Sequence, residues 1–90
     1  MSVEIIIPQF LQHLMDNVNT INVDGETVGE CLEELVRRFP RLEEILYDVE
    51  GNLPHLLNVY VNKESAFPEE MARSVREGDT IHIAYTLVGG

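Results

Sequence analysis

The chain of 90 residues has few cysteines, few basic residues and no long apolar segment, and each shortage excludes a class of protein. Cys31 is the only cysteine, so no internal disulfide can form and no Cys-x-x-Cys pair is present. No apolar run is long enough to span a membrane, and the chain does not begin with a cationic signal segment. We therefore expect a cytoplasmic protein without a membrane segment.

Basic residues are also scarce. Six Lys and Arg stand against 16 Asp and Glu, which gives a formal net charge of −10. This charge disfavours binding to nucleic acid or to an anionic membrane, and a basic protein partner fits it better. Solubility alone also explains a high negative charge, and the charge by itself favours that simpler explanation over docking.

No group of side chains predicts a catalytic or metal site. His13, His55 and His82 lie in separate segments, without a carboxylate at metal-ligand spacing, and are expected on the surface. Cys31 is expected to be a half-buried packing residue whose pKa is lowered somewhat by the first turn of a helix. We do not expect it to be catalytic.

Alternation of apolar and polar residues predicts four strands. Pro8 ends the first strand because it lacks a backbone donor, and Gly78-Asp79 forms a tight turn before the last strand. The strands are expected over residues 3–7, 17–24, 58–62 and 80–87.

One amphipathic helix is predicted after Thr27. The Thr27 hydroxyl can accept a hydrogen bond from the amide three residues on, and Glu30 can reach back to the Thr27 N–H, which is a capping box. Pro40 ends the helix. The residues of its apolar face are Val28, Leu32, Leu35, Val36 and Phe39.

The connecting segments are less regular. In residues 9–16, Phe10, Leu11 and Leu14 are expected to cover an edge of the core. Short helical turns are expected over residues 42–47 and 72–77, and turns with an edge segment over residues 63–70.

The element order, strand-strand-helix-strand-strand, predicts an α+β domain of the β-grasp (ubiquitin-like) type. Its mixed sheet has four to five strands, with the first and last adjacent in the middle and one main helix across one face. We expect a single domain over residues 1–87 and a flexible tail over residues 88–90. In that tail, Gly89 and Gly90 can pass through a channel too narrow for any Cβ, and they follow Val88 directly. The functional group is then the Gly90 carboxylate.

Several motifs resemble the MoaD and ThiS family of ubiquitin-like sulfur carriers. They are the short apolar first strand, Val61-Asn62 after the third strand, the Gly-Asp turn within residues 77–81, and the terminal Gly89-Gly90. The resemblance covers nearly the whole chain. Ile7-Pro8 and residues 58–64 are most similar to the carriers that supply sulfur to amino-acid biosynthesis, such as cysteine formation.

The resemblance implies a protein co-substrate, not an enzyme. A free carboxylate at neutral pH is a poor acyl electrophile, so a ubiquitin-activating-type enzyme would adenylate Gly90 with ATP. A sulfur donor protein would then displace AMP to leave a thiocarboxylate, which supplies sulfide to an acceptor synthase or hydrolase. No bound cofactor and no metal are implied.

Three alternatives stay open. Within the family, the chain is the small sulfur-donating subunit for molybdopterin synthesis, or serves thiazole synthesis. From another class, it is a ubiquitin-like modifier conjugated to lysine through Gly90. The third alternative is an acidic interaction domain with an inert tail.

A docking surface is expected on the sheet face turned away from the helix. If Val59 and Val61 face the helix, then Ile6, Tyr60 and Ala84 point outward and form an apolar patch for the activating enzyme. The alternative is that Ile6 and Tyr60 only cover each other across strands.

Overall fold

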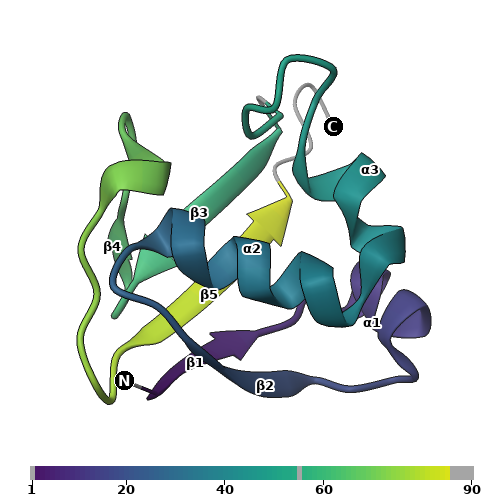
Figure 1. Ribbon diagram of the computed structural model, residues 1–90, viewed down its shortest axis with the longest axis horizontal. Coiled ribbons are helices and arrows are strands. Elements are labelled where there is room, and N and C mark those ends of the chain that lie inside the picture. Colours follow the sequence, from purple (N-terminus) through teal and green to yellow (C-terminus); the bar gives the residue numbers. More distant parts are fainter. Residues whose placement is uncertain (1, 55, 86–90) are drawn as a thin grey trace.

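The computed structural model describes residues 2–54 and 56–85, which form a sheet layer and a helix layer (Figure 1). The strands are β1 (Ser2–Ile6), β2 (Thr20–Asp24), β3 (Leu57–Val61), β4 (Glu64–Ser65) and β5 (Thr80–Tyr85). The α-helices are α1 (Gln9–Gln12), α2 (Val28–Arg38) and α3 (Glu43–Leu46). Short 3-10 helices are η1 (His13–Met15), η2 (Pro40–Leu42) and η3 (Glu70–Ala72). No helix in these residues is both long enough and apolar enough to cross a membrane.

The sheet has the strand order β2-β1-β5-β3-β4. β1 and β5 are parallel, and every other neighbouring pair is antiparallel. The predicted α+β fold, with a mixed sheet and its first and last strands adjacent in the middle, is confirmed. The edge segment expected within residues 63–70 is β4, a two-residue strand beside β3.

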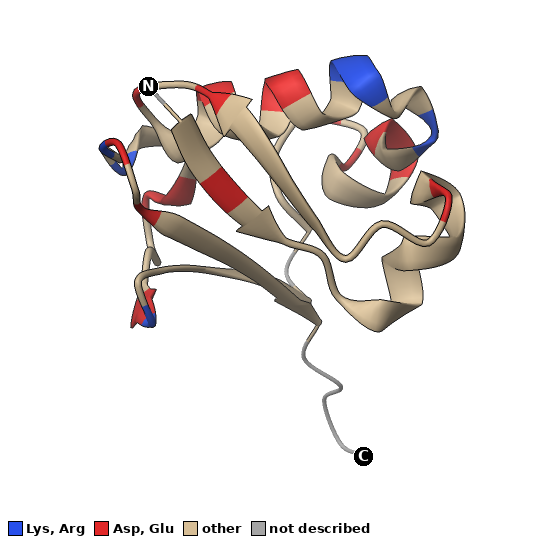
Figure 2. Ribbon diagram, turned by 90° about the horizontal axis from the view of Figure 1, so that it is seen from below, with Lys and Arg blue, Asp and Glu red and all other residues tan. Residues whose placement is uncertain are grey.

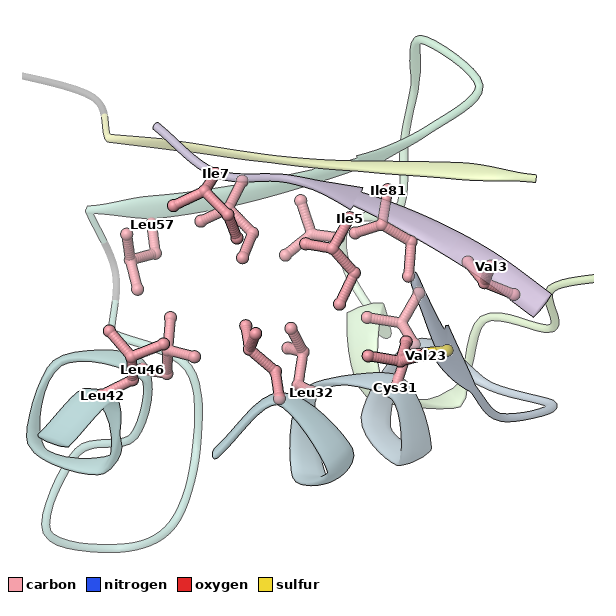
Figure 3. Packing of buried hydrophobic residues seen from close by; sticks show 14 of the residues in the cluster. Val3, Ile5, Ile7, Val23, Cys31, Leu32, Leu42, Leu46, Leu57 and Ile81 are labelled. Carbon is pink, nitrogen blue, oxygen red and sulfur yellow. The ribbon is translucent and has the colours of Figure 1, made fainter. Parts of the chain in front are cut away.

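The core lies between the inner face of the sheet and α2 (Figure 3). Ile5 is paired with Ile81, and Val59 with Ile83, so alternate residues of neighbouring strands project to the same side. From α2, Leu32 is fully buried against them. The predicted helix stripe is confirmed: Val28, Leu32 and Leu35 are buried, and Val36 and Phe39 pack against the core from its rim.

The cap of α2 differs in one bond from the expected capping box. The Glu30 N–H donates to Thr27 Oγ1 at 3.1 Å, as expected, but the Glu30 carboxylate accepts from the N–H of Glu26 at 2.9 Å, and not from that of Thr27. Thr27 is extended and forms a β-bridge with Ser74. This pairing directs the chain before the helix so that Glu26 presents its N–H to the Glu30 carboxylate.

The same bridge corrects the helical turn expected over residues 72–77. The turn lies earlier, in η3; Arg73 is extended, Ser74 forms the bridge, and residues 77–78 form a turn. The Val28 N–H donates to the Arg73 carbonyl, and the Val75 N–H donates to the Glu26 carbonyl, so these residues pair with the chain before α2. Long-range pairing therefore overrides the local helical preference. The turn expected over residues 42–47 is confirmed by η2 and α3.

The segment between β1 and β2 is helical, in α1 and η1. Leu11 and Met15, four residues apart, are both fully buried, which is the spacing of one helix face. Leu14 packs against the core as expected. The expectation that Phe10 covers the core edge is wrong, because Phe10 precedes Leu11 on the helix and projects to another side, where it is exposed.

Candidate functional site

The outward sheet face holds the predicted docking residues. Val59 and Val61 are buried on the helix side, and Tyr60 between them is half-buried on the opposite side, so the predicted register of β3 is confirmed. Ile6 and Ala84 occupy outward positions of β1 and β5 in the same way. The strand register therefore brings Ile6, Tyr60 and Ala84 to one face.

Ile6 and Tyr60 are not neighbours across two strands. His82 pairs with Ile6 on one side and with Tyr60 on the other, so it lies between them. Outside this trio, Ile6 pairs with Thr20 on β2, and Tyr60 pairs with Ser65 on β4. One row of side chains thus crosses all five strands, half-buried in the middle and exposed at both ends.

His82 belongs to this face although the sequence pattern does not single it out as a docking residue. The alternation of buried Ile81 and Ile83 already places His82 outward, so a signal for it exists. Of the other histidines, His13 is exposed as expected, and His55 lies outside the described residues.

The middle of the outward face is nearly free of formal charge. β3 and β5 contain no Asp, Glu, Lys or Arg, and Glu4 is the acidic residue of β1. Figure 2 shows this contrast: the central strands are mostly tan, and red positions gather on the helices and loops. The row through Ile6, His82 and Tyr60 is therefore a weakly polar strip on an acidic protein.

An aromatic pair marks the end of β5. The rings of Phe10 and Tyr85 contact each other, and 41% of Phe10 and 43% of Tyr85 are exposed. Sequence reasoning missed this pair, because it assigned Phe10 to the core. Tyr85 is the last described residue; Val88, Gly89 and Gly90, the predicted tail and reacting group, lie outside the described residues.

At the other end of β5, the motifs Val61-Asn62 and Gly78-Asp79 form one hydrogen-bonded corner. Asn62 has a φ of 51° and donates through Nδ2 to Asp79 Oδ1 at 2.9 Å. Its Oδ1 accepts from the Thr80 N–H at 3.0 Å. These bonds join the end of β3 to the start of β5, so the motifs have a structural role.

The corner also affects ionisation. The hydrogen bond from Asn62 and a second one from the Arg76 N–H lower the pKa of Asp79, because both stabilise its charged form.

Cys31 is fully buried, deeper than expected, and its pKa moves opposite to the expectation. Burial, followed by the negative charges of Glu30 and Asp24, raises the pKa of the thiol to about 11. Desolvation therefore outweighs any effect of the helix start. A thiol in this state is a packing group, as predicted, and not a nucleophile.

Within residues 2–54 and 56–85, no three His, Cys, Asp or Glu side chains are grouped so that they could hold a metal ion.

The chain is similar to known proteins along almost its whole length. The family model described as "ThiS family" matches residues 5–90. The sulfur carrier protein CysO of Mycobacterium tuberculosis is 28% identical over 93 aligned positions, which cover 100% of both chains.

Two solved structures extend this similarity to the fold. A chain of the Amycolatopsis orientalis BexX/CysO complex superimposes with a TM-score of 0.87 and 29% identity, covering 98% of this chain and 99% of that one. SAMP1, the small archaeal modifier protein 1 of Haloferax volcanii, gives a TM-score of 0.86 and 28% identity, with 100% of both chains covered. Both likenesses support the β-grasp arrangement.

Proposed function

Because this chain belongs to the ThiS family, we propose that it is a sulfur carrier whose Gly90 carboxylate is the reacting group. The observation that carries the proposal is the extent of the matches. The family match runs through residue 90, and the alignment with the sulfur carrier protein CysO covers both chains completely, so the similarity includes Gly89 and Gly90. The chain is then a protein co-substrate on which partner enzymes act.

The chemistry begins with activation of Gly90. At neutral pH the carboxylate is an anion, and an anion resists attack by a nucleophile. A ubiquitin-activating-type partner transfers AMP from ATP to the carboxylate and releases pyrophosphate. A sulfur donor protein then supplies sulfide sulfur, which forms the C–S bond as the C–O bond to AMP breaks. The product is a thiocarboxylate, whose sulfur is a good nucleophile at neutral pH.

The thiocarboxylate then delivers its sulfur in the active site of an acceptor synthase or hydrolase. The similarity to CysO supports cysteine or another sulfur-containing amino acid as the destination of the sulfur. Synthesis of molybdopterin or thiazole is the alternative destination within the same chemistry.

Partner docking uses the outward sheet face in this proposal. The strip through Ile6, His82 and Tyr60, with Ala84 on the same strand as His82, offers the activating enzyme a surface without Asp, Glu, Lys or Arg. The likeness to a chain of the BexX/CysO complex supports a carrier that forms complexes with partner proteins.

Deletion of Gly90 tests the proposal. The buried core lies between Val3 and Ile83, so the shortened chain should keep its melting temperature while losing ATP–pyrophosphate exchange with its activating enzyme. Intact-mass measurement of the full chain after incubation with the enzyme, ATP and a sulfur donor should show a gain of about 16 Da, since sulfur replaces oxygen. Normal exchange by the shortened chain would overturn the proposal.

A second candidate is a ubiquitin-like modifier that ends in an isopeptide bond to lysine. The likeness to SAMP1, complete over both chains, favours it. The same mass measurement separates the two, because a modifier gives conjugates to other proteins. Lys63 is the only lysine of this chain, so copies joined through a side-chain amine disappear in a Lys63→Arg variant, while conjugates to other proteins persist.

A further inference from the structure

Two aromatic rings, those of Phe10 and Tyr85, lie exposed at the end of β5. They contact each other, and each residue keeps about two fifths of its surface accessible, 41% for Phe10 and 43% for Tyr85. Across residues 2–54 and 56–85, four large hydrophobic side chains are exposed, and the other two, Val49 and Phe67, lie in turns. Aromatic side chains are enriched where proteins dock, so a pair of accessible rings is a candidate contact surface.

The pair lies on the helix side of the sheet and is separate from the outward face. Tyr85 follows Ile81 and Ile83 at a spacing of two, and both isoleucines are buried toward the helix layer. Ala84, one residue before Tyr85, occupies an outward position. Ala84 and Tyr85 therefore project to opposite sides of the strand directly before residues 86–90. A protein that encloses those residues meets the outward face on one side and the aromatic pair on the other.

The segments that meet at the end of β5 contain no acidic or basic residue. Phe10 of α1 contacts the Tyr85 ring, and Leu57 is the partner of Tyr85 on β3. The sequence has no Asp, Glu, Lys or Arg in residues 5–15, 51–62 and 80–90, although 16 acidic and six basic residues occur in the rest of the chain. Figure 2 shows this end of the sheet in tan, away from the red and blue positions. The partner surface that fits here is apolar, and not basic as the net charge alone would suggest.

The length of chain after Tyr85 limits how far away the partner can be. In the proposed function, on which this inference rests, Gly90 is the reacting group, and it is five residues beyond Tyr85. A fully extended chain spans at most about 3.6 Å per residue, so the reach from Tyr85 to Gly90 is at most about 18 Å. An active site lies below the surface of its enzyme, so the rim of the entrance comes closer to Tyr85 than that. Since His82 is three residues farther back, the rim reaches the aromatic pair before it reaches the outward row.

We propose that Phe10 and Tyr85 dock against an apolar rim at the active-site entrance of the activating enzyme. The two rings contact this rim on the helix side, while the row through Ile6, His82 and Tyr60 contacts the same enzyme on the other side of the sheet. The edge-to-face contact already orders both rings in the free protein, so little side-chain freedom is lost on binding. The pair positions Gly90 in the active site and takes no part in the chemistry.

Kinetics of ATP–pyrophosphate exchange test the pair. Phe10→Gln with Tyr85→Thr replaces both rings by residues that suit a helix and a strand. The KM of the activating enzyme for this double variant should rise at least tenfold while kcat stays within twofold, because the lost contacts bind ground state and transition state alike. Phe67→Gln is the matched control, since it removes a more exposed ring beyond β4 at the edge of the sheet, and its KM should stay within twofold. An unchanged KM for the double variant, or an equal rise for Phe67→Gln, would overturn the proposal.

A measurement on the unaltered chain removes any dependence on how well the variants fold. In the complex with the activating enzyme, NMR cross-saturation from the enzyme should reach the ring protons of Phe10 and Tyr85 and spare those of Phe67. Rings of Phe10 and Tyr85 that receive no saturation would refute the contact, whatever the variants show. Sedimentation of the wild type alone should give a monomer; a dimer that the double variant does not form would assign the pair to a second copy of this chain and overturn the proposal.

A competition assay separates docking from the chemistry of Gly90. The chain without Gly90 keeps both docking surfaces, so it should inhibit exchange by the wild type. The same shortened chain with Phe10→Gln and Tyr85→Thr should inhibit at least tenfold more weakly. Equal inhibition by the two shortened chains would refute the role of the pair and leave the carrier proposal standing. Absence of exchange with the wild type itself would instead refute the proposed function, and this inference with it.

Discussion

The aromatic rings of Phe10 and Tyr85 meet edge to face, with their centroids 5.2 Å apart and their planes at 67°. One ring comes from α1, near the start of the chain, and the other from the last described residue of β5. The pair therefore fastens the end of a central strand to the connection between β1 and β2.

A double-mutant cycle measures this contact. Phe10→Ala and Tyr85→Ala should couple by about 0.5–1.5 kcal/mol, near the lower end because both rings are partly exposed. Urea unfolding of the wild type, the two single variants and the double variant gives the coupling energy. Strict additivity of the two single changes would show that the rings do not stabilise each other.

Tyr60→Glu tests the proposed docking face. Because Tyr60 points away from the core, the variant should stay folded, yet its affinity for the proposed activating enzyme should fall at least tenfold, as an aromatic anchor of an interface typically contributes about 2 kcal/mol or more. Calorimetry with a melting curve for the same sample separates binding from stability. Thr20→Glu adds the same charge at the exposed end of the row and is the matched control. A folded Tyr60→Glu chain that binds normally would place the docking surface elsewhere.

Cys31 should make the protein sensitive to alkali. The thiol pKa is about 11 in the folded chain and 9.0 ordinarily, so ionisation favours the unfolded state. The contribution of the protonated Cys31 thiol to the free energy of unfolding is complete below about pH 9 and is lost as the pH rises toward 11. The stability advantage of the wild type over Cys31→Ala should therefore shrink between pH 7 and pH 10.5, by about 1–2 kcal/mol. Denaturant unfolding at both pH values checks this; a constant difference would refute a buried, protonated thiol.

The contribution of Asp79 to stability should depend on pH in the acid range. The pKa of Asp79 lies below the ordinary 3.8 in the folded chain, mainly because of the hydrogen bond from Asn62. The ionised carboxylate therefore stabilises the fold at neutral pH, and this stabilisation is lost as the pH falls through the folded pKa. Asn62→Gly removes the side chain and keeps a residue that accepts the positive φ. NMR titration of the Asp79 carboxyl should show a higher pKa in the variant, and the stability cost should be smaller at pH 2 than at pH 7. The same pKa in both chains would show that Asn62 does not hold the carboxylate.

The spacing of apolar residues in the sequence predicts the strands and the helix that bury one face. The alternation around Ile5 and Val59, and the helical spacing of Val28, Leu32 and Leu35, survive in the structure because slipping by one residue would expose the whole apolar set. The outward position of Tyr60 follows from the same rule, and so does that of His82.

Pairings between distant segments leave no such periodicity. The bridge from Thr27 to Ser74 redirects both the helix cap and the chain after η3, yet neither residue lies in a strand pattern. The helix cap and the path of the chain after η3 therefore depend on contacts between distant segments, which local composition does not reveal.

The position of β5 in the sheet also bears on protein synthesis. β5 leaves the ribosome after every other strand, yet it alone joins the β1–β2 pair to the β3–β4 pair. A chain whose translation stops before Thr80 has two separate hairpin-like pairs and no continuous sheet. Such a fragment also lacks His82, the centre of the outward row. Prematurely terminated chains therefore lack the continuous sheet and the outward row, and they cannot compete with the longer chain for a partner that binds this face.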